Sequence, residues 1–275
     1  MRRVLVVLVA TAYLAAGWSL FVEPLPLWSL GALALAYAVV ITLSVCLLEL
    51  GTFLDVDLSV PSAGARVALS FDDGPHPVHT RRILDALDAR GAKASFFVIG
   101  EKAAAQPELL REIVARGHEL ALHSWAHDRH LYLRDPVAIA RELERSIEVV
   151  EAATGQRPRL FRPPIGFSTP RTRAAVELLG LRVAGWSVRA FDGVASASSE
   201  AVARRVARRL APGAIVLLHD AAERGDREPA SVAALPAILD AIAERGLRAV
   251  TVSELVSAPD EPCSSDVADA RVAAY

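Results

Sequence analysis

Two adjacent carboxylates stand where they could act on a metal ion and on a water molecule. Asp72 and Asp73 end a β-rich run and are followed by Gly74 and Pro75, which favour a turn. Adjacent side chains at the end of a strand point in different directions. One carboxylate can therefore bind a metal ion while the other faces a reacting water, although such a motif on its own is more often a simple turn.

Two histidines four residues apart could supply further metal ligands. His123 and His127 enclose the segment Ser-Trp-Ala. On a helical turn, residues at this spacing lie on one face, so both imidazoles can converge on one ion. Two histidines and one carboxylate form an open metal site that leaves room for water and substrate. The pair is moderately specific alone, and together with the two aspartates it favours a catalytic metal site.

Short β-rich runs and helical patterns alternate from residue 66 onward, and they must position these side chains. This alternation predicts a parallel sheet with right-handed crossovers, either open and doubly wound or closed as a barrel. The expected strands cover residues 66–71, 93–99, 119–122, 159–161, 181–186, 214–219 and 248–252. The expected helices cover residues 78–90, 107–116, 136–153, 170–179, 199–210 and 232–245.

Six polar residues that could do chemistry fall at or shortly after the carboxyl ends of these strands. Both architectures place their sites in the loops that follow strand carboxyl ends. We therefore expect these six side chains to share one site: Asp72, Asp73, His123, Arg162, Asp192 and His219.

Four motifs together resemble the polysaccharide deacetylase family, a chitooligosaccharide deacetylase-like group also known as carbohydrate esterase family 4. They are the aspartate turn, the histidine pair, Phe-Arg-Pro-Pro-Ile-Gly at 161–166 and Leu-Leu-His-Asp at 217–220. The match covers roughly residues 66–256, with the motifs in the order the family has. The resemblance implies a distorted TIM-like (β/α) barrel with about seven strands. It also implies a divalent metal, usually zinc, with Co²⁺, Ni²⁺ or Mn²⁺ as alternatives.

The resemblance also implies the reaction and the residue roles. The reaction is hydrolysis of an N-acetyl group on an aminosugar, a carbon–nitrogen bond that is not a peptide bond. By position, Asp73, His123 and His127 would be the metal ligands, Asp72 the general base and His219 the general acid. This chemistry needs no serine or cysteine nucleophile, and no Gly-x-Ser-x-Gly motif occurs.

Two further residues would support this set. Arg162 would hold the base, and Asp192 would either orient Arg162 or tune His219. A backbone N–H in the turn at 164–166 would stabilise the oxyanion. The chain departs from the family by having Ile165 where tyrosine is usual and by lacking the tryptophan that usually follows Asp192. Isoleucine at 165 keeps the backbone donor but changes the pocket wall, so it bears on the choice of substrate rather than on the chemistry. The missing tryptophan bears on how the acetyl group or the sugar packs.

The N-terminal part of the chain is apolar. Residues 4–22 and 24–48 carry no charge, and each run is long enough to cross a hydrocarbon core. We expect an N-terminal hydrophobic helical hairpin over 1–57, a deacetylase domain over 58–257 and a disordered tail over 258–275. A cleaved signal peptide starting with Arg2 and Arg3 is the alternative, which the second apolar run disfavours.

The hairpin predicts that the chain is anchored in a membrane, for which the bacterial cytoplasmic membrane is the expectation. Arg2 and Arg3 favour a cytoplasmic N-terminus and therefore a cytoplasmic body. The acidic residues Glu49, Asp55 and Asp57 leave the side of the membrane open. A net charge of −2 argues against a general nucleic-acid binder. Two cysteines imply no disulfide framework, and the oligomeric state stays open.

Three functions fit these features. The first is removal of acetate from an N-acetylated glycan such as peptidoglycan or a chitin-like oligomer. The second is deacylation of a lipid-linked sugar, which a membrane anchor would suit. The third is a catalytically silent glycan-binding module. The presence of a base, three metal ligands and an acid argues against the third, because binding alone does not require them together.

Overall fold

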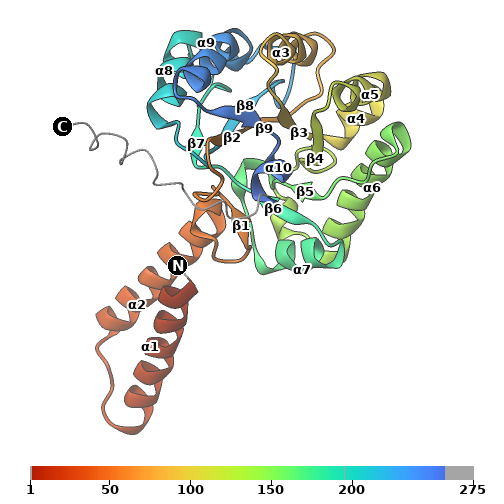
Figure 1. Ribbon diagram of the computed structural model, residues 1–275. Helices are drawn as coiled ribbons and strands as arrows, with labels where there is room; N and C mark the ends of the chain where they lie inside the picture. Colours follow the sequence, from red (N-terminus) through yellow and green to blue (C-terminus); the bar gives the residue numbers. More distant parts are fainter. Residues whose placement is uncertain (1, 195, 258–275) are drawn as a thin grey trace, which may run out of the picture.

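A curled parallel sheet forms the centre of the body in the computed structural model, which describes residues 2–194 and 196–257 (Figure 1). The strand order is β1-β6-β5-β4-β3-β2-β8-β7, and β9 pairs with β2. Its strands are β1 (Val56–Asp57), β2 (Arg66–Asp72), β3 (Ala94–Val98), β4 (Glu119–Leu122), β5 (Leu160–Phe161), β6 (Arg182–Ala184), β7 (Val188–Arg189), β8 (Ile215–His219) and β9 (Arg248–Val250). All these strand pairs are parallel, so all the strands end on one side of the sheet.

Helices surround the curled sheet on its outside (Figure 1). They are α3 (His79–Asp88), α4 (Gly100–Ala105), α5 (Pro107–Ala115), α6 (Pro136–Thr154), α7 (Pro170–Leu178), α8 (Ser199–Arg209) and α9 (Ala230–Glu244). The short helix α10 (Val252–Val256) lies across one end of the barrel instead. The expected distorted TIM-like barrel is confirmed. All seven expected strands and six expected helices are present. The two-residue strands β1 and β7 were missed, because they form only through pairing with β6 and β8.

Local sequence signals explain where the long helices begin and end. Asp135 precedes α6, and its side chain accepts hydrogen bonds from the N–H groups of Val137 and Ala138. The helix ends at Gly155, whose φ of 72° lies in the left-handed region that favours glycine. Caps of this kind fix the helix ends, and so they fix the loops that carry the site.

The central strand β2 is buried on both faces. Val67, Leu69 and Phe71 pack with the surrounding helices in the largest hydrophobic cluster. Ser70 and Asp72 alternate with them and point into the barrel, because successive side chains of a strand face opposite ways. The barrel interior is therefore polar at the carboxyl end of its central strand.

The opposite end of the barrel is closed by α10. The N–H of Val252 donates to Ser95 Oγ at 2.8 Å, and the N–H of Ser253 donates to Glu119 Oε2 at 3.1 Å. Ser95 and Glu119 lie at the beginnings of β3 and β4. Hence α10 covers the amino ends of the strands and leaves their carboxyl ends open.

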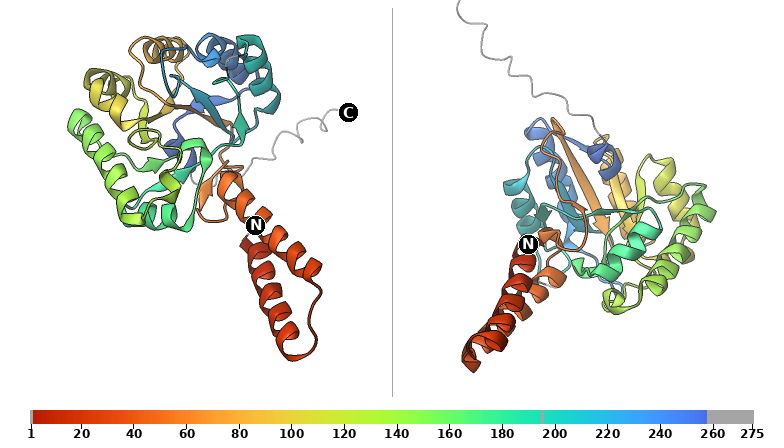
Figure 2. Two further views of the ribbon diagram at one scale, coloured as in Figure 1. Left: turned by 180° about the vertical axis from the view of Figure 1, so that it is seen from behind. Right: turned by 90° about the horizontal axis from the view of Figure 1, so that it is seen from below.

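The expected N-terminal hairpin consists of α1 (Arg2–Phe21) and α2 (Leu27–Cys46), followed by the short helix η1 (Leu48–Leu50). The two long helices lie side by side and project from the body (Figures 1 and 2). Among the described residues, α2 is the helix whose length and apolar composition would allow it to cross a membrane, and it is almost entirely exposed. Signal sequences share its length and composition. The second span expected over 4–22 stays a prediction, and the tail at 258–275 lies outside the described residues.

Candidate active site

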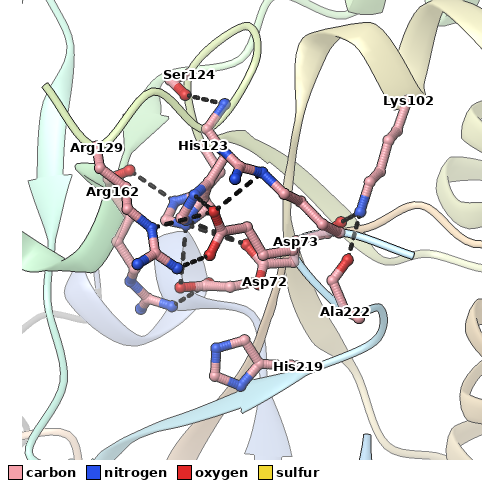
Figure 3. Close-up of polar contacts among 12 residues, drawn as sticks. Asp72, Asp73, Lys102, His123, Ser124, Arg129, Arg162, His219 and Ala222 are labelled. Carbon is pink, nitrogen blue, oxygen red and sulfur yellow. Dashed lines mark hydrogen bonds and ion pairs between the residues drawn. The ribbon is translucent and has the colours of Figure 1, made fainter. Parts of the chain in front are cut away.

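Asp72 and Asp73 take different directions at the end of β2 (Figure 3). Asp72 is the last residue of the strand, and its Oδ1 accepts a hydrogen bond from Arg162 Nη1 at 2.6 Å. Asp73 has a φ of 73°, in the left-handed region, which turns its side chain out of the strand's alternation. Both side chains are buried. The strained residue at 73 thus separates two adjacent carboxylates into two environments.

Three donor atoms converge beside Asp72. Asp73 Oδ1 lies 3.5 Å from His123 Nε2 and 3.5 Å from His127 Nε2. The three residues are buried, and their ligand atoms lie within 4.8 Å of one another. Asp73 Oδ1 has no hydrogen-bond partner although it is buried, a costly state for a carboxylate oxygen. A divalent cation would satisfy this oxygen, so the donor set fits a metal ion.

His123 is held in the tautomer that a metal ligand requires. Its Nδ1 lies 2.8 Å from the carbonyl oxygen of Arg162, which can only accept. The proton therefore sits on Nδ1, and the lone pair of Nε2 faces Asp73. Burial lowers the pKa of His123, which also favours the neutral imidazole.

The path of the chain between the two histidines differs from the helical turn that their spacing predicts. Residues 123–127 form a loop, in which Ser124 has a φ of 67° and His127 a φ of 51°. Ser124 Oγ accepts from the N–H of His127 at 3.0 Å and closes the turn. The helix expectation was wrong because two left-handed residues, which no period reveals, bring the imidazoles together instead.

Arg162 is fully buried, and each of its three guanidinium nitrogens donates a hydrogen bond. Its Nε donates to the carbonyl of Ala184 at 3.0 Å, and its Nη2 donates to the carbonyl of Gly185 at 2.8 Å. Its Nη1 also donates to Ser70 Oγ at 3.0 Å. Burial lowers the pKa of Arg162 and the adjacent Asp72 opposes that shift. The guanidinium is therefore a fixed cation that leaves Asp72 one orientation.

Asp192 contacts His219 rather than Arg162, the other partner considered for it. Its Oδ1 lies 3.0 Å from His219 Nδ1, and its Oδ2 accepts from the backbone N–H of His219 at 2.8 Å. Burial of the imidazole lowers the pKa of His219, but the negative charges of Asp192, Asp73 and Asp72 raise it by more. The result raises the pKa of His219 to about 9. The imidazole is thus kept protonated near neutral pH.

A cleft of about 720 Å³ joins these groups. The two aspartates, the two histidines and His219 line it, together with the apolar side chains of Ile165, Trp186 and Leu217. Ile165 has a φ of 61° within the short helix η3 (Pro164–Gly166). In that turn the N–H groups of Gly166 and Phe167 bond to carbonyls, while the N–H of Ile165 has no acceptor among the described residues. The N–H of Ile165, a residue that lines the cleft, is therefore available as a hydrogen-bond donor.

Two further residues support the metal ligands and give no signal in the sequence. Glu223 Oε1 lies 3.3 Å from His127 Nδ1, and the same carboxylate forms an ion pair with Arg129. Lys102 Nζ donates to the carbonyl oxygens of Asp73 and Ala222, at 2.7 Å each (Figure 3). Both come from segments with ordinary surface composition, so only the folded arrangement singles them out.

A buried acid lies directly after His219. Asp220 accepts from Thr80 Oγ1 at 2.6 Å through Oδ2, while its Oδ1 has no partner. Burial is the main cause that raises the pKa of Asp220 to about 7. A Cβ on Gly74 would lie 2.1 Å from this carboxylate, which explains the glycine at that position.

Comparison with known proteins places this geometry in a family. The family model "Polysaccharide deacetylase" matches residues 59–184. A chitooligosaccharide deacetylase from Bradyrhizobium sp. is 36% identical over 189 residues, which cover 66% of this chain and 85% of that protein. A peptidoglycan-N-acetylglucosamine deacetylase from Bacillus cereus is 33% identical over 205 residues, covering 73% of this chain and 92% of that protein.

The fold is similar to that of a solved structure from the same family. The family 4 carbohydrate esterase from Streptomyces lividans, solved in complex with acetate, has a TM-score of 0.61 and 33% identity. The similarity covers 68% of this chain and 92% of that one. On sequence, fold and coverage together, this chain belongs to the polysaccharide deacetylase family, carbohydrate esterase family 4.

Proposed function

We propose that this chain is a metal-dependent N-deacetylase that hydrolyses the N-acetyl group of an aminosugar in a glycan such as peptidoglycan or a chitin-like oligomer. The observation that carries the proposal is the unpartnered, buried Oδ1 of Asp73 between the Nε2 atoms of His123 and His127. The relatives of this chain include a chitooligosaccharide deacetylase and a peptidoglycan-N-acetylglucosamine deacetylase, which supports this substrate class. We propose zinc as the ion, with Co²⁺, Ni²⁺ and Mn²⁺ as alternatives that such ligands also accept.

Asp73, His123 and His127 would hold the ion, which when bound supplies Lewis acidity to the amide carbonyl and acidifies water. Asp72 would take a proton from the attacking water as its oxygen bonds to the carbonyl carbon. Arg162 occupies Oδ1 of Asp72, which leaves Oδ2 for that proton. One oxygen of Asp72 therefore accepts from Arg162, and the other would accept the proton of the water.

The second half of the reaction lies with Ile165 and His219, which also line the cleft. The N–H of Ile165 would donate to the developing oxyanion. His219, kept protonated by Asp192, would give its proton to the leaving nitrogen as the carbon–nitrogen bond breaks. The products would be acetate and a free amine. A water proton moves to Asp72, and the proton on the amine comes from His219.

Acetate release from a panel of N-acetylated glycans tests the proposal. The holoenzyme, the chelated protein and the protein with each metal added back should be compared on chitooligosaccharides and on peptidoglycan fragments. We expect release that chelator abolishes and one metal restores. A silent glycan-binding module would bind these glycans and release no acetate under any of the three conditions.

Deacylation of a lipid-linked sugar is a second candidate, favoured by one contact. The carbonyl of Val45, in the last turn of α2, accepts from the N–H of Ser168, which lies in the loop that carries Ile165. We propose that the N-terminal hairpin anchors the chain in the bacterial cytoplasmic membrane, so the site would lie near lipid. Deacylation of a polyprenyl-linked aminosugar, without turnover of soluble glycans, would favour this candidate.

A further inference from the structure

The end of the apolar helix α2 is built into the wall of the cleft. Leu48, two residues after Cys46 at the end of α2, is buried in the same hydrophobic cluster as Trp186. A Cβ on Gly166 would lie 3.4 Å from Leu48 Cβ, and both Gly166 and Trp186 line the cleft. Two residues of chain span at most about 7 Å. The helix end and the cleft wall are therefore immediate neighbours.

If α2 crosses a membrane, this contact fixes the position of the cleft relative to the bilayer. Its 20 residues are about 30 Å long, which matches the hydrocarbon core. The carboxyl end of α2 would then lie at the headgroups, and the wall that Leu48 supports would lie at the same level. The inference thus rests on the membrane anchor proposed above.

The hairpin leaves the body beside β1, at the edge of the sheet, and slants toward the side of the open strand ends (Figures 1 and 2). The α10 helix covers the amino ends of the strands, and the right-hand view of Figure 2 shows the hairpin extending away from α10. The cleft lies among the loops that follow the strands' carboxyl ends. These loops therefore lie on the membrane side of the body.

The short helix η2 (Leu131–Leu133) presents an apolar side chain next to the hairpin base. Thr169 Oγ1 donates to the carbonyl of Tyr132 at 2.9 Å, and the adjacent Ser168 holds α2. Leu133 is 54% exposed although it is a large apolar residue. A loop that is fixed to the anchor and exposes leucine is suited to a lipid interface.

The loop after β7, the last strand in the sheet order, also exposes large apolar side chains. Val194 and Phe191 are exposed and line the cleft. Arg189 and Arg227 also line it, and neither forms an ion pair with a carboxylate among the described residues. Arg227 donates to the carbonyl of Gly193, and the Arg189 guanidinium lies over the rings of Trp186 and Phe191. Both cations lack a carboxylate counter-ion in the described part of the chain, and together with the exposed apolar side chains they match an anionic bilayer surface.

We infer that the rim formed by Leu133, Arg189, Phe191, Val194 and Arg227 binds the surface of an anionic phospholipid bilayer. The mouth of the cleft is then held at the headgroups. A substrate reaches it from the membrane surface, either as a membrane-borne sugar or as a glycan strand lying close to the bilayer.

Fluorescent labels on the full-length chain in vesicles test this inference. Single cysteines replace Leu133 or Val194 on the rim, or Glu244 at the far end of α9 as the matched control, in a background with Cys46→Ser and Cys263→Ser. Each is labelled with a polarity-sensitive dye and reconstituted with zwitterionic lipid or with added anionic lipid. Brominated lipids then serve as the quencher.

We expect blue-shifted, quenched emission at positions 133 and 194, greater with anionic lipid, and no change at position 244. Flotation of the vesicles reports the anchor separately. A chain that fails to float overturns the anchor, whereas a chain that floats with all three labels unquenched overturns the rim. Neither readout uses turnover, so failure of the deacetylase proposal is seen only in the acetate assay.

Discussion

The carboxylate of Asp192 holds His219 at two points, with Oδ1 3.0 Å from the ring Nδ1 and Oδ2 2.8 Å from the backbone nitrogen. Asp192 is fully buried, and burial opposes its ionisation. The charge of His219, together with hydrogen bonds from His219 and Ser231, outweighs that effect and lowers the pKa of Asp192. The two groups therefore form an ion pair whose imidazole Nε2 is the end left for a leaving group.

Replacing Asp192 with Asn should shift the pH dependence of turnover. The amide keeps an acceptor for Nδ1 but removes the charge, so the pKa of His219 falls from about 9. A general acid works only when protonated, so kcat/KM should decline at lower pH than in the wild type. We expect a loss of about tenfold or more at pH 8 and a smaller loss at pH 6.

The pH–rate profile, with the imidazole followed by NMR, checks this expectation. An equal loss at every pH, with an unchanged titration of His219, would show that Asp192 is only structural.

Replacing either residue of the aspartate pair should separate metal binding from turnover. Asp73→Ala removes the oxygen between the two histidines and should abolish binding of one metal equivalent. Asp72→Asn keeps an acceptor for the buried Arg162 guanidinium, so it should fold and bind metal with an affinity close to that of the wild type. Its kcat should fall by about 10²- to 10⁴-fold because the proton acceptor is gone.

Calorimetric titration with Zn²⁺ and the acetate assay measure the two effects on the same preparations. If Asp72→Asn kept wild-type turnover, the base would have to be another residue.

Glu223→Gln should lower the metal affinity of the site, because Glu223 supports the metal-ligand candidate His127. The Oε1 atom of Glu223 lies 3.3 Å from Nδ1 of His127, which has no hydrogen bond of its own in this geometry. A carboxylate behind a metal-bound imidazole orients the ring and strengthens the ligand, so its loss costs about 10- to 100-fold in metal affinity.

The matched control is Glu228→Gln in the same loop, which pairs with Arg82 and does not face His127. The absorption spectrum of the Co²⁺ form should change in Glu223→Gln alone. Identical spectra and dissociation constants in both variants would rule out the supporting role.

Asp220→Asn should stabilise the chelated protein at alkaline pH. An aspartate titrates near 3.8 when unfolded, and the pKa of buried Asp220 is raised to about 7. Between these values the folded state binds the extra proton, so stability falls as pH rises from about 4 to 7 and stays lower above it. Asparagine accepts from Thr80 without a charge to bury.

Thermal unfolding in chelator at pH 5 and pH 8 measures this. The variant should gain stability on the order of 1 kcal/mol at pH 8 and little at pH 5. A loss at pH 8 would mean that the ionised carboxylate is stabilised by a cation, for which Lys102, whose charge lowers the pKa of Asp220, is the candidate.

The alternation of strands and helices was strong enough to predict the body of the fold. Seven strands and six helices follow from period and from breakers such as Gly155, whose left-handed φ ends α6. The short strands β1 and β7 could not be predicted, because their pairing with β6 and β8 depends on neighbours distant in sequence.

The sequence alone determined that Asp72, His123 and His219 lie at one end of the sheet, because parallel strands bring their carboxyl ends together whatever the loops do. The tertiary structure alone decided that Asp192 contacts His219, that Glu223 stands behind His127 and that α2 ends against the cleft wall. Each of these contacts depends on the path of a loop. Left-handed residues such as Asp73 and His127 set that path, and packing between distant segments selects their conformation rather than any local pattern.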